Sequence, residues 1–183
     1  MRTFISINWS ASTLELFQAW QRELQGWGVK GYWRRGANLH LTLKFLGEIR
    51  PDQVQEIDRV LRAAAAGMPA FALTLAGLGV FPNLREPRIL WAGVQSGELY
   101  TLQDRVERGL VPLGFSPEKR GYHPHLTLAS GGISGLTPKI LAAGERFHRV
   151  EQVSMFELME SVVHEGGRRY RVLAEYPLAQ CEL

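Results

Sequence analysis

His40-Leu41-Thr42-Leu43 and His125-Leu126-Thr127-Leu128 are two copies of one tetrapeptide, HLTL, placed 85 positions apart in a chain of 183 residues. The same offset relates other segments of the chain. Residues 3–8, which are apolar and typical of a β-strand, correspond to residues 88–93, and residues 71–75 correspond to 156–160. A repeat at a fixed offset indicates two copies of one structural unit. We therefore expect two related halves.

Helical patterns alternate with these strands in both halves. Residues 10–26 place apolar side chains on one helical stripe that ends at a glycine, and residues 99–114 repeat this pattern at the same offset. Further helices are expected after Pro51 and, in a shorter form, after Pro138. Repeat units of about 1–85 and 86–170, followed by a strand near 170–174, then cover almost the whole chain. The prediction is an α+β protein that forms a single bilobal domain over residues 1–183, with approximate two-fold symmetry.

The two HLTL segments divide into a polar face and an apolar face. Because side chains alternate along a strand, His40 and Thr42 point to one side, and His125 and Thr127 do the same in the second copy. The opposite face of the first copy is expected to carry Leu39, Leu41, Leu43 and Phe45. Burying an imidazole and a hydroxyl without partners costs free energy. We therefore expect the polar faces to meet across one cleft.

Two histidines across a cleft suit a reaction that needs one base and one acid. A neutral imidazole can take a proton from water, while an imidazolium gives one to a leaving alkoxide. The two threonine hydroxyls can donate to the oxygens of a phosphoryl group. Cys181 is the single cysteine, and no carboxylate stands beside either histidine. The sequence therefore predicts opening of a phosphodiester, or its reverse, without a metal or cofactor.

These segments resemble the two-histidine (2H) phosphoesterases, and within them the RNA 2′,3′-cyclic phosphodiesterases, which are also called LigT-like proteins or 2′-5′ RNA ligases. The resemblance rests on two His-x-Thr motifs in their wider context. The matching stretches are NLHLTLKFLG (38–47), PRILWAGV (87–94), GF (114–115), RGYHPHLTLA (120–129) and ES (160–161). The resemblance implies a bilobal 2H phosphoesterase fold, in which two related antiparallel sheets carry helices outside and enclose a central cleft.

The resemblance also implies a reaction and a role for each motif residue. The expected activity is hydrolysis of 2′,3′-cyclic phosphate ends of RNA to 2′-phosphates, and the reverse reaction would join RNA ends by a 2′-5′ linkage. We expect His40 to be the proton donor and His125 the proton acceptor, and the approximate symmetry leaves the opposite assignment open. Thr42 and Thr127 are expected to bind the phosphate. The expected partners are RNA ends or nucleotides with a 2′,3′-cyclic phosphate.

One position departs from the family pattern. The second motif usually continues to an arginine that contacts the phosphate, but this chain has Ser130 there. Lys44 would be in phase with the histidine and threonine of the first strand, and other cations lie in flanking loops. We expect that at least one of these residues supplies the missing charge, and the candidates are Lys44, Arg34, Arg35 and Arg120, with Ser130 itself as a further phosphate contact.

Aromatic and histidine residues near the second motif leave alternatives open. Phe81 and Tyr122 are candidates for stacking on a nucleobase, and ordinary packing is the competing interpretation. His123 and His125 have the spacing of two metal ligands on one face, but a third ligand is not evident, and zinc sites need three or four. The sequence therefore favours no metal site.

Composition narrows the class of protein. Apolar residues make up 45% of the chain and charged residues 21%, which is typical of a globular domain and excludes a disordered chain. No apolar run is long enough to cross a membrane, so we expect a cytoplasmic protein, and a monomer. Two rival functions remain: a 2H-fold module that binds nucleotides without turnover, and an enzyme for small cyclic phosphates such as ADP-ribose 1″,2″-cyclic phosphate.

Overall fold

The computed structural model describes residues 1–165 and 167–180, so Cys181 lies outside the described residues. The strands form two antiparallel sheets. One sheet has the order β3-β1-β8-β9, built from β1 (Arg2–Ile7), β3 (Leu41–Glu48), β8 (Met155–His164) and β9 (Gly167–Pro177). The other has the order β2-β6-β5-β4-β7, built from β2 (Lys30–Trp33), β4 (Phe71–Phe81), β5 (Ile89–Gln95), β6 (His125–Ser134) and β7 (His148–Val153). The expected α+β fold with two antiparallel sheets is confirmed.

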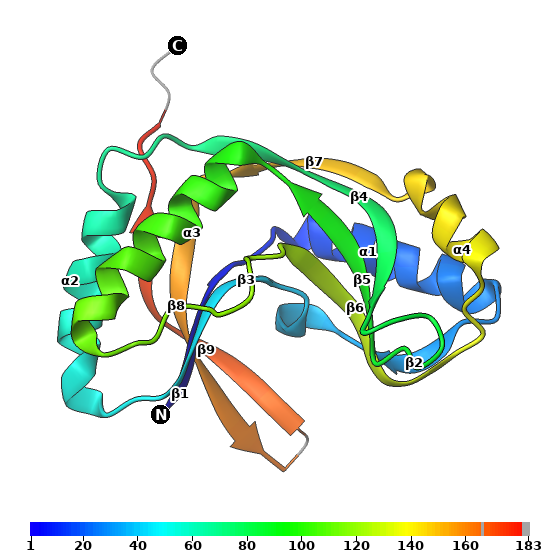
Figure 1. Cartoon of the computed structure of the whole chain (residues 1–183), viewed down its shortest axis with the longest axis horizontal. Helices are drawn as coiled ribbons and strands as arrows, with labels where there is room; N and C mark the ends of the chain where they lie inside the picture. Colours follow the sequence, from blue (N-terminus) through cyan, green and yellow to red (C-terminus); the bar gives the residue numbers. More distant parts are fainter. Residues whose placement is uncertain (166, 181–183) are drawn as a thin grey trace.

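Helices cover the outer side of each sheet. The α-helices are α1 (Ala11–Gly26), α2 (Val54–Ala65), α3 (Gly97–Leu110) and α4 (Pro138–Ala142). Short 3-10 segments are η1 (Gly36–Asn38), η2 (Pro51–Gln53), η3 (Val111–Leu113) and η4 (Ala143–Arg146). Figure 1 shows α2 and α3 beside the four-stranded sheet, and α1 and α4 beside the five-stranded sheet. Among the described residues, no helix has the length and apolar character needed to span a membrane.

Local sequence explains where the two long helices begin. Ser10 precedes α1 and accepts a hydrogen bond from the backbone N–H of Thr13, and Ser96 precedes α3 and accepts one from Leu99. Each serine thus satisfies one N–H group that a helix N-terminus leaves without a partner. The helices expected over residues 10–26 and 99–114 are confirmed. Two edge strands, β2 and β7, were not expected, because they are short and mostly exposed and therefore lack a clear apolar alternation.

The two halves of the sequence exchange strands. At the offset of 85, β1 corresponds to β5, β3 to β6, and β4 to β8. In space, however, β8 pairs with β1, and β4 pairs with β5. Each sheet therefore takes its third strand from the other half. The repeat units of about 1–85 and 86–170 do not coincide with the two lobes, and neither half contains a complete sheet.

The apolar side of each HLTL strand lies in the core. Leu41, Leu43, Leu126 and Leu128 are each at most 2% exposed. Full burial of a leucine side chain contributes about 1.5–3 kcal/mol to folding. The leucines therefore fix which face of each strand turns inward, and the histidines and threonines between them must face the other way.

A β-bulge follows the threonine in both HLTL strands. In the first sheet Ile5 pairs with Lys44 and Ser6 pairs with Thr42, so Leu43 is an extra residue. The corresponding pairing of β5 with β6 shifts at the same place in the repeat, where Leu128 is the extra residue. A bulge reverses the alternation beyond it. The expectation that Lys44 shares a face with Thr42 is therefore wrong, as is the expectation that Phe45 lies on the leucine face: Phe45 is 69% exposed.

Candidate functional site

A cleft of about 420 Å³ opens between the two sheets and collects both HLTL motifs. Its inner end is formed by the motif histidines and threonines and one arginine: His40, Thr42, His125, Thr127 and Arg34. Its outer end is formed by residues of β1, β3 and the β8–β9 hairpin: Arg2, Thr3, Gly47, Ser161 and Arg168. The remaining lining residues are Phe4, Asn38, Phe45, Ile89 and Tyr170. The polar faces of the two repeats thus meet in one cavity.

The two histidines are held in the same way. The Nδ1 atom of His40 lies 3.0 Å from the carbonyl oxygen of Ala37, and that of His125 lies 2.7 Å from the carbonyl oxygen of His123. In each ring Nδ1–H donates to the backbone, which leaves Nε2 available for chemistry. Because each carbonyl accepts from Nδ1–H, it fixes the ring orientation in both the neutral and the protonated form.

Both histidines favour the neutral form. Burial lowers the pKa of His40, its hydrogen bond to Ala37 opposes this shift, and the nearby charge of Arg34 lowers the pKa further. Burial also lowers the pKa of His125, against the opposing effect of its hydrogen bond to His123. An imidazolium needs solvent or an anion to stabilise it. A bound phosphate would provide that anion, so ligand binding favours protonation of the site.

Aromatic rings surround each histidine. Phe4 stacks on His40 at a centroid distance of 4.7 Å, and Tyr170 packs edge-on against the same ring at 5.3 Å. On the other lobe, Phe81 packs edge-on against His125 at 5.2 Å, with Trp91 at 6.3 Å. These contacts explain the desolvation of the imidazoles. Sequence reasoning missed Phe4 and Tyr170 as site residues, although Phe4 lies on the expected first strand.

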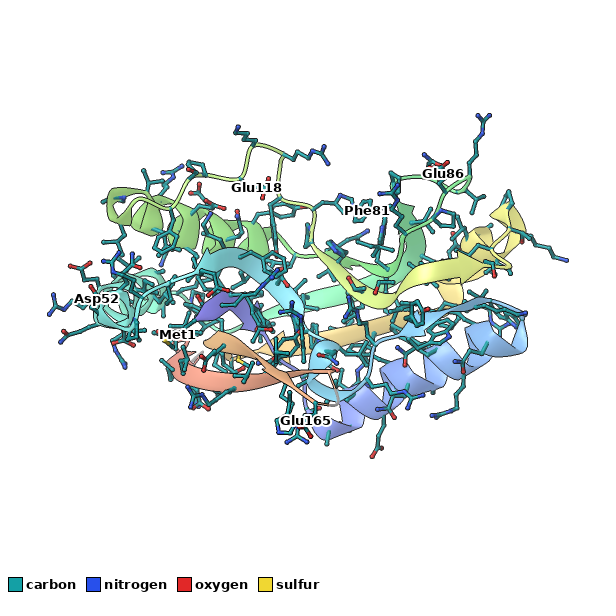
Figure 2. All side chains as sticks on the ribbon, turned by 90° about the horizontal axis from the view of Figure 1, so that it is seen from below. Met1, Asp52, Phe81, Glu86, Glu118 and Glu165 are labelled. Carbon is teal, nitrogen blue, oxygen red and sulfur yellow. The ribbon has the colours of Figure 1, made fainter. Side chains whose placement is uncertain are left out.

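Phe81 and Tyr122, the two candidates for base stacking, do not line the cleft. Phe81 packs among Trp91, His123 and His125, near the end of β4, where Figure 2 labels it. The Tyr122 hydroxyl donates a 2.9 Å hydrogen bond to the carbonyl oxygen of Thr42, and burial raises its pKa. The packing interpretation therefore fits both residues, and Tyr122 ties the segment before His125 to the strand that carries Thr42.

Of the cations expected to replace the family arginine, Arg34 alone lines the cleft. Its backbone N–H donates to the carbonyl oxygen of Leu128 at 2.9 Å, so it follows the β2 strand directly beside the second motif. Ser130 pairs with Tyr32 and Ile89 but does not line the cleft. Arg34 therefore occupies the neighbourhood of the missing arginine from the adjacent strand.

The other expected cations lie elsewhere. Lys44 is 8% exposed, and its Nζ atom contacts Glu107 Oε2 at 2.8 Å and the carbonyl oxygen of Ser116 at 3.1 Å. The structure does not bring Lys44 to the cleft, because the bulge turns it towards α3. Arg35 and Arg120 do not line the cleft either. Arg120 is exposed on the loop whose outer part is marked by Glu118 in Figure 2.

The two candidate metal ligands, His123 and His125, lie near each other, and the described residues provide no third ligand beside them. Their ring centroids are 6.3 Å apart, and His123 is exposed at the edge of the site. Across residues 1–165 and 167–180, no group of three or more histidine, cysteine, aspartate or glutamate side chains is arranged to hold a metal ion.

Comparisons with known proteins agree with this geometry. The model of the LigT like Phosphoesterase family matches residues 9–91 and 93–164. The chain is 37% identical to an RNA 2′,3′-cyclic phosphodiesterase of Aeropyrum pernix over 78% of this chain and 83% of that protein. It is 30% identical to one of Thermotoga maritima over 96% of this chain and 94% of that protein.

Solved structures extend the similarity to three dimensions. The crystal structure of E. coli LigT in apo form superimposes with a TM-score of 0.80 at 27% sequence identity, and 98% of each chain is covered. The crystal structure of E. coli LigT complexed with 3′-AMP gives a TM-score of 0.77, also at 27% identity and 98% coverage of each chain. The family model, the relatives and the solved structures agree, and this chain belongs to the LigT-like family of phosphoesterases.

Proposed function

We propose that this chain hydrolyses 2′,3′-cyclic phosphate ends of RNA to 2′-phosphates without a metal. The observation that carries the proposal is the pair of histidines in one cleft, each held through Nδ1 by a backbone carbonyl. The two relatives of Aeropyrum pernix and Thermotoga maritima are RNA 2′,3′-cyclic phosphodiesterases, which supports the substrate class. A nucleotide fits a cavity of this size, which lies in the usual range for small-molecule sites.

The reaction needs one proton acceptor and one proton donor. His125 Nε2 takes a proton from water as the water oxygen attacks phosphorus. The bond from phosphorus to the 3′ oxygen breaks, and that oxygen takes a proton from His40 Nε2–H. The product carries a 2′-phosphate and a 3′-hydroxyl, and proton transfer between solvent and the two rings restores the starting state. Each backbone carbonyl stabilises the ring that is positively charged at that stage.

The phosphate charge is held by hydroxyls and an arginine. Thr42 and Thr127 line the cleft from opposite lobes and donate to the two non-bridging oxygens. Arg34 supplies the positive charge that the family arginine supplies from the position of Ser130. Its proximity to His40 is an additional reason for the lowered pKa of that ring, and a bound phosphate between them compensates this effect.

The same site also supports ligation, with a 5′-hydroxyl in place of water. Attack of a 5′-hydroxyl on the cyclic phosphate, with loss of its proton to His125 and protonation of the 3′ oxygen by His40, gives a 2′-5′ linkage. The residues are the same as for hydrolysis, because a hydroxyl group replaces water. Incubation of an RNA 2′,3′-cyclic end with an excess of a 5′-hydroxyl oligonucleotide tests this activity by the appearance of a longer product.

Phosphorus NMR of a nucleoside 2′,3′-cyclic phosphate tests the main proposal. The wild-type chain, freed of metal by a chelator, is expected to convert the cyclic signal to that of the 2′-phosphate. His40→Ala and His125→Ala are each expected to lose at least 10³-fold in kcat, at the scale of general acid–base catalysis. Full turnover by either variant would overturn the mechanism. Turnover of ADP-ribose 1″,2″-cyclic phosphate in preference to RNA ends would favour the small-substrate alternative.

A further inference from the structure

The outer end of the cleft is positively charged and lies away from the motif residues. Arg2 and Arg168 line it, and no carboxylate of the described residues lines any part of the cleft. Along β3 the inner end is marked by Thr42 and the outer end by Gly47. Five residues of strand span about 15 Å. A phosphate held at Thr42 is therefore too far from Gly47 to contact the outer end of this strand.

Arg168 is held over the same end by its own hairpin. Its Nη1 atom donates a 3.1 Å hydrogen bond to Ser161 Oγ, across the β8–β9 hairpin. A guanidinium has five N–H donors, so this bond orients the group and leaves donors for an anion. Figure 1 shows this hairpin extending away from the helices, and Figure 2 labels Glu165 near its tip.

We propose that the outer end binds the phosphodiester one nucleotide upstream of the reacting cyclic phosphate, with Arg168 as its contact. This inference rests on the proposed function, because the cyclic end must occupy the histidines. Phe4, Phe45 and Tyr170 line the cleft between the two ends, and these rings suit the intervening nucleoside. The substrate class is therefore an oligonucleotide end rather than a mononucleotide.

Three substrates with the same 2′,3′-cyclic end test the inference. They are a mononucleotide, a dinucleotide with one upstream phosphodiester, and the same dinucleotide with an uncharged methylphosphonate at that linkage. The wild-type chain is expected to show about tenfold higher kcat/KM for the charged dinucleotide than for the neutral one, the scale of one charge-assisted hydrogen bond. The logarithm of this ratio is expected to fall with log salt at a slope of about 0.7.

Arg168→Gln is expected to bring the charged-to-neutral ratio close to one and to abolish its salt dependence. Arg169→Gln is the matched control, because Arg169 is exposed on the same hairpin but does not line the cleft; it should keep the wild-type ratio.

The outcomes distinguish failure of the upstream phosphate site from failure of the proposed hydrolysis. If the wild-type chain hydrolyses all three substrates and treats the charged and neutral dinucleotides alike, the upstream site is overturned and the proposed function stands. An Arg168→Gln variant with the wild-type ratio would overturn the role of that arginine. If the wild-type chain hydrolyses none of the three, the proposed function fails, and the upstream site fails with it.

Discussion

Replacement of Glu107 by glutamine leaves the ammonium group of Lys44 in the core without a charged partner. The side chains of Lys44 and Glu107 are 7% and 14% exposed, and their charged atoms are 2.8 Å apart. Removal of one member of a buried ion pair costs about 3–5 kcal/mol. Glutamine still accepts a hydrogen bond and Ser116 keeps its contact, so we expect a loss near the lower limit, about 3 kcal/mol.

In the double variant Lys44→Met/Glu107→Gln no unpaired charge remains in the core, because both partners are neutral. Its free energy of unfolding should fall by much less, about 1 kcal/mol. Arg108→Gln is the control, since it breaks an exposed pair with Asp104 on the same helix and should cost at most about 0.5 kcal/mol. Urea unfolding, followed by tryptophan fluorescence, measures all three. The Glu107→Gln variant should also melt about 6–12 °C lower in a thermal scan.

A small cost of the single variant or a large cost of the double variant would refute this reasoning. If Glu107→Gln costs less than about 1 kcal/mol, or if the double variant costs at least as much as Glu107→Gln alone, the pair does not stabilise the fold as a buried unit. The activity of the double variant gives a second check. Its KM for a cyclic phosphate should equal that of the wild type, because Lys44 faces α3 rather than the cleft. A large rise in KM would restore Lys44 as a phosphate contact.

Three further results are expected. The pH optimum of kcat/KM should lie below 6.5, because burial lowers the pKa of both His40 and His125. The free enzyme then loses its protonated acid as the pH rises, and an optimum above pH 7.5 would contradict this expectation. Gly79→Ala should destabilise the fold and lower kcat, since an added Cβ would overlap the ring of Trp91, which packs against His125; equal activity and melting temperature would count against that packing. Tyr122→Phe should cost about 1 kcal/mol in urea unfolding through the lost hydrogen bond to the first motif, and an unchanged midpoint would show that the bond contributes nothing.

Much of the fold follows from local sequence, and the exceptions have a common cause. The alternation of leucines with His40 and Thr42 correctly predicts the inward face of the strand, because it depends only on side-chain period. The bulge at Leu43 depends on how β3 pairs with β1, forty residues away, and no local pattern marks it. The sequence therefore misplaces Lys44 and Phe45, the two residues directly after the bulge.

Exchange of strands between the halves was hidden for the same reason. The repeat shows that β4 and β8 are equivalent, but equivalence holds whether each strand stays with its own half or crosses to the other. The choice depends on contacts between distant segments. The exchange also places β8 and β9 in the sheet that contains the first HLTL strand, so that Tyr170 contacts His40. No sequence pattern marked Arg168 as a site residue, although this arginine lines the cavity.

Elements without a counterpart in the repeat make the two histidines different. β2 pairs with β6, whereas the segment at the same offset, residues 115–118, contains Pro117 and forms no strand beside β3. Arg34 follows β2 and lies near His40, and Tyr170 comes from β9, which lies outside the repeat. An exact two-fold site would give both rings equal pKa values and could not assign one donor and one acceptor. Arg34 and Tyr170 make the surroundings of His40 different from those of His125. In the proposed mechanism, a bound phosphate beside Arg34 therefore favours protonation of His40.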